Sequence, residues 1–514
     1  MTKQTFKKYG SVAVLALMSL ILLWQNIENA PWEKQRIIRS DVSIYYTYLP
    51  ATIINNDPFF ELKDTLNSGK YRVRTSEIGR NSVKMSMGVA FMDLPFFYVG
   101  HLYALSSDKY EADGYSEPYH LAISISSAFY TILGFIFLWL VLKRTFTELA
   151  SLLTVILIVF GTNLYLYSVY ETGMSHPITF FLLSALLYLV QNWLNRKGIW
   201  KSFLIGILLG LIVLVRPINI LFILPIIILL KNRDISWAAY FKTLFLPFSY
   251  IIAVLLGGIL IILPQLIFWK FQTGSILSYS YGKEGFFWMN PHVWEGLFSF
   301  RKGWFIYTPL MFFALFGMVR LFKIQRMYFW AIIIFLPIFF YVTFSWWCWW
   351  YGGSFGARTL IDILPFMAIP LAALIDWMLE SKWRYALLLI PILLMRVNLF
   401  QSWQYGKGII HFDSMTWEGY KTIFFKDYTP NHYWGLLQEP DYSGAVNNGV
   451  EKELYPVVSS DPQSPVYEKS IQNTIKYLKS DEGWVKSVRE RAENNNISID
   501  SSLRVTAIWV LEQK

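Results

Sequence analysis

Several ionisable residues stand at the ends of long apolar segments, where they could do chemistry at the surface of a membrane. They are the acids Asp41 and Glu171, the imidazole of His176, and the cations Lys84, Arg216, Lys302 and Arg358. An ionisable group near the hydrocarbon is a functional candidate because its charge is costly there. A carboxylate can accept the proton of a hydroxyl group, and a cation can bind a lipid phosphate. The set therefore suits a reaction between a hydroxyl group and a phosphate-bearing lipid.

The chain that positions these residues has the composition of a membrane protein. Hydrophobic types make up 55% of its 514 residues and charged types 16%, whereas soluble domains carry about 25% charged residues. The apolar residues form blocks of about twenty, the length needed to cross a hydrocarbon core. We therefore predict an all-α polytopic membrane protein with about eleven spans. The predicted spans are 10–27, 120–142, 148–168, 176–194, 202–216, 218–231, 244–268, 305–322, 328–346, 359–378 and 384–400.

Basic residues are concentrated in every second loop between these spans. The basic loops contain Lys3/Lys7/Lys8, Lys143/Arg144, Arg196/Lys197/Lys201, Lys231/Arg233/Lys242, Arg320/Lys323/Arg326 and Lys382/Arg384. Cytoplasmic loops carry such an excess of Lys and Arg. We therefore predict a cytoplasmic N-terminus and a C-terminal region outside the cytoplasmic (inner) membrane, in the periplasm. The net charge of +10 is then a signal of topology, and nucleic acid is not an expected partner.

Residues 85–105 are apolar and long enough to span, but a span here would move every later basic loop to the outside. The stretch also contains Asp93 and His101, which are costly against lipid. We therefore predict an amphipathic or re-entrant helix in the outer interface. Residues of about 28–119 then form one long external loop, with a second amphipathic helix near 42–54.

The composition changes near residue 400, which predicts two domains. Residues 1–400 form the transmembrane domain, whereas residues 401–514 are polar and contain Asp-Pro, Ser-Pro and Asn-Asn-Asn breakers. Patterned runs within 466–493 and 500–512 predict two or three small helices in this external region.

Several motifs resemble those of a known family of membrane enzymes. An acid follows soon after the first span, and a Lys-x-x-x-Gly-x-x-x-x-x-x-Pro-Phe-Phe run is formed by Lys84, Gly88, Pro95, Phe96 and Phe97. Downstream lie the blocks YETGMSHPITFF, LVRP, RKGWFIYTP and FGARTLIDILPF. Over about residues 10–400, these motifs together resemble the GT-C superfamily of membrane glycosyltransferases, and most closely its protein-mannosyltransferase and aminoarabinose-transferase (family 39-like) branch.

This resemblance implies a GT-C-like fold and an inverting glycosyltransferase. Its donor is a sugar on a polyprenyl phosphate, and its acceptor is a hydroxyl group of an unknown glycan, lipid or protein at the outer face of the membrane. The family's general base is an acid early in the first external loop, which corresponds to Asp41. Its phosphate-contacting lysine corresponds to Lys84. The branch uses no metal ion, and we predict no metal and no cofactor.

Other candidates are chosen from their positions at the outer ends of the spans. Glu171 is a candidate second catalytic acid or acceptor-binding group. The candidates for the donor phosphate are Arg216, Lys302 and Arg358, and those for the acceptor or for an accessory role are His176, Tyr45 and Tyr46.

These candidates also have structural alternatives. Asp41 could cap the helix that follows it, since Asp is a favoured N-cap, and Glu171 could simply be solvated in a turn. Arg216 and Lys302 could anchor helix ends at the interface. For the whole chain the alternative is a transporter or flippase for a lipid-linked or small solute. Such proteins tend to place charges at the bilayer midplane and to contain two related halves, whereas the charges here gather at span ends.

Overall fold

The computed structural model describes residues 3–62, 71–230, 248–451, 454–459, 462–463 and 466–512, and the chain divides into two units. Unit 1 comprises Met1–Gly282, Tyr307–Thr343 and Ala357–Ser402. Unit 2 comprises Lys283–Ile306, Phe344–Gly356 and Trp403–Lys514. The last part of unit 2 begins close to the domain boundary that the composition predicts, but this unit also includes two earlier segments of the chain.

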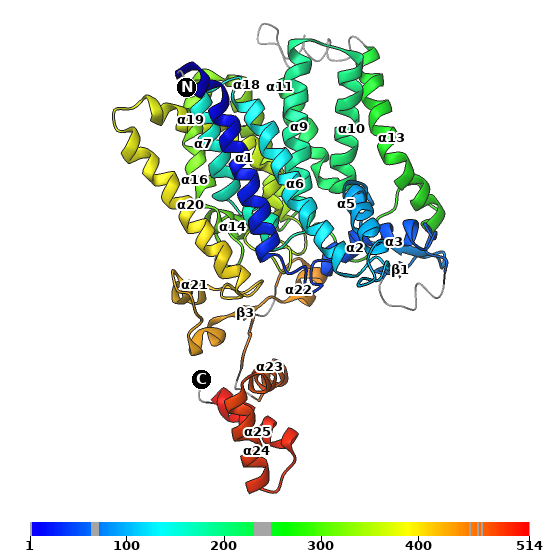
Figure 1. Ribbon diagram of the computed structural model, residues 1–514, viewed down its shortest axis with the longest axis vertical. Coiled ribbons are helices and arrows are strands. Elements are labelled where there is room, and N and C mark those ends of the chain that lie inside the picture. Colours follow the sequence, from blue (N-terminus) through cyan, green and yellow to red (C-terminus); the bar gives the residue numbers. More distant parts are fainter. Residues whose placement is uncertain are drawn as a thin grey trace. The chain divides into compact units, whose positions relative to one another are not determined.

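Unit 1 consists mainly of long helices (Figure 1). Among the described residues, eight helices are long and apolar enough to cross a membrane. They are α1 (Lys3–Asn29, of which Gly10–Asn29 is the apolar part), α5 (Gly88–Leu105), α6 (Glu117–Leu142), α9 (Ser175–Asn195), α13 (Phe248–Thr273), α18 (Arg326–Phe344), the joined η2 (Arg358–Ile363) and α19 (Leu364–Glu380), and α20 (Arg384–Gly406). The chain is therefore a multi-pass membrane protein, as its composition predicts.

The remaining predicted spans are shorter or interrupted helices. The shorter ones are α7 (Glu148–Phe160), which α8 (Leu164–Val169) follows, α10 (Ile199–Val215), and the pair η1 (Pro217–Phe222) and α11 (Ile223–Leu229). The segment predicted at 305–322 is divided into α15 (Trp304–Tyr307), α16 (Pro309–Leu315) and α17 (Gly317–Ile324). Pro309 begins α16 and cannot donate the hydrogen bond that would continue α15. The basic loop with Lys231, Arg233 and Lys242, and the predicted start of the 244–268 span, lie outside the described residues.

Helices α6, α9, α10 and α13 lie side by side in this order (Figure 1). Because α9 and α10 are consecutive and joined by a short connection, they run in opposite directions. The start of α9 and the end of α10 therefore meet at the same end of the row. This arrangement brings His176, the second residue of α9, close to Arg216, which follows α10.

Hydrogen bonds place the end of α1 beside the start of α6. The Asn26 side-chain amide donates to the Ser124 carbonyl at 3.0 Å, and the backbone N–H of Ile37 donates to His120 Nδ1 at 3.2 Å. The segment 30–116 therefore begins and ends at the same end of α1 and α6, so it forms a single loop. This loop contains α2 (Ser40–Tyr46), α3 (Tyr48–Ile53), the hairpin of β1 (Val73–Thr75) and β2 (Asn81–Val83), and α5. The helix predicted near 42–54 is thus present as the pair α2 and α3.

Helix α5 is continuous, so no re-entrant turn occurs within it. Its first residue, Gly88, touches α10 so closely that a Cβ there would lie 2.4 Å from the backbone. Its buried acid, Asp93, accepts a hydrogen bond from Ser126 of α6 at 2.8 Å. Its exposed face is apolar and includes Val99 and Leu102. The predicted amphipathic character is therefore wrong, because α6 supplies partners for the polar side chains and leaves an apolar face outside.

Unit 2 is built from shorter elements. They are α14 (Val293–Phe298), α21 (Trp417–Ile423), η3 (Asn431–Leu436), α22 (Tyr442–Asn448) and the paired strands β3 (Gln438–Glu439) and β4 (Tyr455–Pro456), followed by α23 (Tyr467–Ser480), α24 (Glu482–Asn494) and α25 (Ile499–Glu512). The last three helices share an apolar core that includes Ile471, Leu478, Val488 and Leu503. These helices confirm the small helices predicted in the C-terminal region.

Candidate active site

Asp41 forms an ion pair with Arg358 in unit 1. Its carboxylate Oδ2 lies 2.8 Å from Arg358 Nη2, and both side chains are partly exposed. Asp41 is the second residue of α2, and within the described part of the chain no side chain caps the start of this helix. The preceding Ser40 has a φ of 49°, a left-handed conformation that persists only where the surrounding structure fixes it. The Asp41 side chain therefore pairs with a cation 317 residues away instead of capping its own helix.

The turn between α8 and α9 brings Glu171 to α2. Glu171 Oε1 lies 3.4 Å from Arg39 Nη2. Gly173 in this turn has a φ of 82°, and a Cβ on it would lie 2.8 Å from Val42 Cγ1. Glycine therefore permits both the turn and its close approach to α2. Burial raises the pKa of the Glu171 carboxyl, while the charges of Arg39 and Arg358 act in the opposite direction.

A second charged set is buried around Asp362. The Asp362 Oδ2 atom lies 3.0 Å from Arg216 Nε and accepts a hydrogen bond from Asn219 Nδ2 at 3.0 Å. Its Oδ1 atom lies 3.5 Å from His176 Nδ1, and Arg216 Nη1 lies 3.2 Å from the same imidazole nitrogen. A carboxylate that is removed from water needs such partners. Asp362 therefore holds together Arg216 and His176, two residues that the sequence singles out.

Helix η2 connects the two sets, because Arg358 is its first residue and Asp362 its fifth. The phenol of Tyr45, from α2, is influenced by both. Burial and then the Asp41 carboxylate raise the pKa of Tyr45, whereas Arg216 and Arg358 act to lower it. Side chains from α2, the α8–α9 turn, the end of α10 and η2 thus form one charged region within unit 1.

Lys84 and Tyr46 make other contacts. The Lys84 ammonium lies 5.1 Å from the centre of the Tyr281 ring, and its backbone carbonyl accepts a hydrogen bond from Ser280. The Tyr46 hydroxyl donates a hydrogen bond to the Gly114 carbonyl. Tyr46 thereby ties α2 to the end of its own loop.

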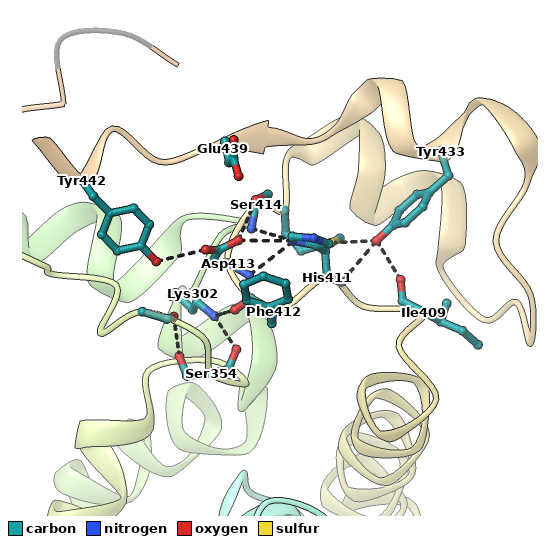
Figure 2. A network of polar contacts seen from close by, with 12 residues as sticks. Lys302, Ser354, Ile409, His411, Phe412, Asp413, Ser414, Tyr433, Glu439 and Tyr442 are labelled. Carbon is teal, nitrogen blue, oxygen red and sulfur yellow. Dashed lines mark hydrogen bonds and ion pairs between the residues drawn. The ribbon is translucent and has the colours of Figure 1, made fainter. Parts of the chain in front are cut away.

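Lys302 belongs to unit 2, whereas Asp41 and Arg358 belong to unit 1. Figure 2 shows that its ammonium group donates to the backbone carbonyls of Ser354 and Phe412. Its side chain is buried. Lys302 thus joins three segments of unit 2 that are distant in the sequence.

The sequence interpretation missed Asp362, Asn219 and Arg39. A signal for Asp362 was present, because an acid inside the predicted span 359–378 is a functional candidate by default. Asn219 and Arg39 gave no such signal, since a polar residue beside a span end and a basic residue within a long loop are both common.

Comparison with known proteins finds structures of archaeal oligosaccharyltransferase. No protein-family model and no curated protein matches the chain. The crystal structure of the Archaeoglobus fulgidus oligosaccharyltransferase in the apo form matches 88% of this chain and 62% of its own at 14% identity, with a TM-score of 0.48. Oligosaccharyltransferase AglB from the same organism, in complex with an inhibitory peptide and a dolichol-phosphate, matches 88% and 61% at 12% identity, with a TM-score of 0.45. The chain thus spans less than two thirds of the length of these neighbours, and similarity at this level assigns no activity to it.

Proposed function

We propose that the chain is an inverting glycosyltransferase that moves a sugar from a polyprenyl-phosphate donor to an acceptor hydroxyl group at the outer face of the cytoplasmic membrane. The observation that carries this proposal is the 2.8 Å pair between Asp41 and Arg358. It joins an acid that can take a proton to a cation that can bind a phosphate, in a unit built of apolar helices. The sugar–phosphate bond of such a donor is already activated, so the reaction requires no nucleotide.

Asp41 acts as the general base in this reaction. Its carboxylate takes the proton of the acceptor hydroxyl while the hydroxyl oxygen attacks C1 of the sugar. The bond from C1 to the phosphate oxygen breaks, its electron pair stays on that oxygen, and the configuration at C1 is inverted. The products are the glycosylated acceptor, polyprenyl phosphate and the protonated acid. Negative charge grows on the phosphate during the step, so a cation there stabilises the transition state more than the ground state.

Arg358 has two tasks in this arrangement. It holds the Asp41 carboxylate in place at 2.8 Å, and its guanidinium carries further N–H donors that suit the oxygens of a phosphate. Arg216 contributes a second guanidinium. Its Nε faces Asp362 and its Nη1 faces His176, while its Nη2 has no hydrogen-bond partner among the residues that the structure describes. Asp362 and Asn219 are then positioning residues that orient Arg216 toward the donor.

The remaining candidates have supporting roles in the proposal. Glu171 and Tyr45 bind the acceptor, because both lie beside the Asp41–Arg358 pair. Lys84 contacts the donor phosphate on its approach to the site. His176 limits the movement of the Arg216 guanidinium.

The positions of the charges favour an enzyme over the transporter or flippase alternative. Arg358 begins η2, Arg216 follows the last residue of α10, and His176 is the second residue of α9. Transporters tend to place such groups near the bilayer midplane, at breaks within the spans. Charges at helix ends instead suit a reaction at the membrane surface.

Transfer of radiolabelled sugar tests the proposal. Purified protein is incubated with a panel of polyprenyl-phosphate sugars and candidate acceptors, and the native chain is compared with Asp41→Asn. Loss of the general base should lower the transfer rate by about 10²–10⁴-fold. The matched control is Asp108→Asn, which changes an exposed acid of the same external loop and should leave the rate unchanged.

Two results would contradict the proposal. Undiminished transfer by Asp41→Asn removes Asp41 from the role of base. Movement of label across sealed vesicles without formation of a glycosidic bond supports the transporter instead.

A further inference from the structure

The segment between α1 and α2 is anchored by a histidine of α6. The backbone N–H groups of Ile37 and Ile38 both donate to His120 Nδ1, each at 3.2 Å. Ile37 and His120 are each only 3% exposed, and a buried N–H group needs such an acceptor. The segment lies outside the helices and strands, so the imidazole takes the place of a helical or sheet partner. Asp41 of the candidate site follows Ile38 by three residues.

These two hydrogen bonds assign the tautomer of His120. A ring nitrogen that accepts from two N–H groups carries no hydrogen, so the hydrogen of the neutral imidazole is on Nε2. The ring also forms a hydrogen bond with the backbone of Tyr115, and Nε2–H is the donor that remains for the Tyr115 carbonyl. Both ring nitrogens are therefore used by the first external loop, one near its start and the other near its end.

The same face of α6 supports the turn that carries Glu171. The backbone N–H of Gly173 donates to Ser127 Oγ at 2.8 Å. Ser127 follows His120 by seven residues, which is about two turns of the helix. A Cβ on Gly173 would lie 3.3 Å from Ile37 Cγ2, so the turn also packs against the anchored segment. Helix α6 thus supports both segments that bring acids to the candidate site.

The conformation of Ser40 shows why the segment needs an anchor. Its φ of 49° is left-handed, which costs free energy for a residue other than glycine. Such a conformation persists only where the surrounding structure fixes the backbone. After Ser40, the Asp41 side chain pairs with Arg358, and before it, His120 holds the N–H of Ile38. Loss of the His120 contact would let the backbone relax and would move the Asp41 carboxylate.

We propose that His120 is a positioning residue for sugar transfer, because its neutral imidazole fixes the segment that places Asp41 beside Arg358. This inference rests on the proposed function, in which Asp41 is the general base. His120 acts through the backbone and not on the substrate. A misplacement of about 1 Å can lower a rate by about 10²-fold even when its cause is far from the chemistry. The anchor therefore affects kcat, whereas KM for the donor depends on Arg216 and Arg358, which belong to other elements.

Two substitutions of His120 separate its two kinds of hydrogen bond. In His120→Asn, the side-chain Oδ1 atom takes the place of Nδ1 and accepts from both N–H groups. In His120→Gln, the amide takes the place of Nε2, so only the contact with Tyr115 is kept. Sugar transfer by His120→Asn should have nearly the native kcat. In His120→Gln, kcat per folded molecule should fall by about 10- to 100-fold, with nearly the native KM for the donor.

Hydrogen exchange measures the anchor without use of the reaction. In a peptide that contains residues 36–41, exchange should be about two- to tenfold faster in His120→Gln than in the native chain, because two N–H groups lose their acceptor. Exchange in His120→Asn should remain near the native rate. The matched control for both measurements is His101→Gln, which changes a histidine of α5 and should leave exchange of this peptide and kcat unchanged.

The two His120 variants distinguish positioning from a merely structural role. A lower kcat in His120→Gln that is absent in His120→Asn supports the inference. Native kcat per folded molecule in both variants overturns it, and so does an equal loss in both, because the acceptor at Nδ1 would then not be the cause. Unchanged exchange in His120→Gln overturns the anchor whether or not the chain transfers sugar. If the native chain transfers no sugar, the proposed function fails and the positioning role fails with it, even where the exchange result is as expected.

Discussion

Two buried polar clusters of unit 1 differ in how completely their hydrogen bonds are formed. In the Asn26 cluster, which comprises Asn26, Ser124, Ser168, Thr131 and Thr172, the Asn26 amide donates to the carbonyls of Ser124 and Ser168 at 3.0 and 2.7 Å. Its Oδ1 atom accepts from the Ser124 hydroxyl at 3.1 Å. Every group in this cluster is neutral and paired. Such a network rigidifies the packing of α1, α6 and α8.

The Asp362 cluster, which comprises Asp362, Arg216, His176 and Asn219, is charged and incompletely paired. Asn219 Oδ1 and, from helix η2, Thr359 Oγ1 are buried without a hydrogen-bond partner among the described residues. Buried polar atoms of this kind are rare in native proteins and call for an explanation. The two clusters thus differ in charge: the Asn26 cluster is neutral and paired, as a structural network is, whereas the buried charges of the Asp362 cluster make it the candidate binding site.

The largest effect on stability is expected from Asp362→Leu. This change leaves the Arg216 guanidinium without its buried partner, which should lower the free energy of unfolding by about 3–5 kcal/mol. Thermal unfolding in detergent measures the change, with Asp108→Leu as a surface control. An unfolding temperature equal to that of the native chain would mean that Asp362 does not hold Arg216.

The double variant Arg216→Met/Asp362→Leu separates stability from function. Replacing both members of a buried ion pair by apolar residues is often neutral, so most of the lost stability should return. Transfer from the lipid donor should still fall by about 10²–10³-fold, because a donor aimed at the developing charge is gone. Native rates in this variant would place the Asp362 cluster in the same structural class as the Asn26 cluster.

Asn26→Leu should lower stability without lowering the transfer rate, which is the reverse of what is expected for the double variant. Hydrogen bonds between membrane helices contribute about 0.6–1.7 kcal/mol, so the unfolding free energy should fall by this smaller amount. The transfer rate per folded molecule should not change. If transfer fell by more than the amount of folded protein, the Asn26 cluster would also have a role in function, and it would no longer differ from the Asp362 cluster in this respect.

The smallest effect on stability and transfer is expected for a substitution of Asp413 in unit 2. This acid is charged, and its carboxylate has hydrogen-bond partners. Ser414 Oγ lies 2.6 Å from Asp413 Oδ1, and the Tyr442 hydroxyl lies 3.0 Å from Oδ2 (Figure 2). Burial acts to raise the pKa of Asp413, but hydrogen bonds from His411, Ser414 and Tyr442 outweigh it and leave the pKa below its ordinary value. A lowered pKa stabilises the folded state above the unfolded pKa of about 3.9, and this contribution is lost as the pH falls through the folded pKa.

Asp413→Asn should therefore flatten the pH dependence of unfolding below about pH 4 and leave sugar transfer at neutral pH unchanged. Unfolding curves at several pH values and the transfer assay measure the two expectations. Impaired transfer would show that charge alone, without open hydrogen bonds, is sufficient to mark a functional residue.

The positions of several site residues could be predicted from sequence because they depend on local pattern. Arg216 and Arg358 were found from the apolar blocks that end at them, and Asp41 from its place early in the first external loop. The role of Asp41 rests on a family resemblance, and it stays a prediction until transfer is measured. The character of α5 was predicted wrongly, because it depends on which neighbouring helix supplies partners for Asp93.

By itself, the sequence determined that the chain crosses a membrane many times and which ionisable residues stand at the ends of its spans. Hydropathy is a property of short segments, so folding is not needed to recognise it. Only the tertiary structure decided that Asp41 pairs with Arg358 and that Asp362 holds Arg216. These facts depend on how distant helices pack and rotate, because a Coulomb interaction or a hydrogen bond is decided by a few ångströms that no local pattern specifies.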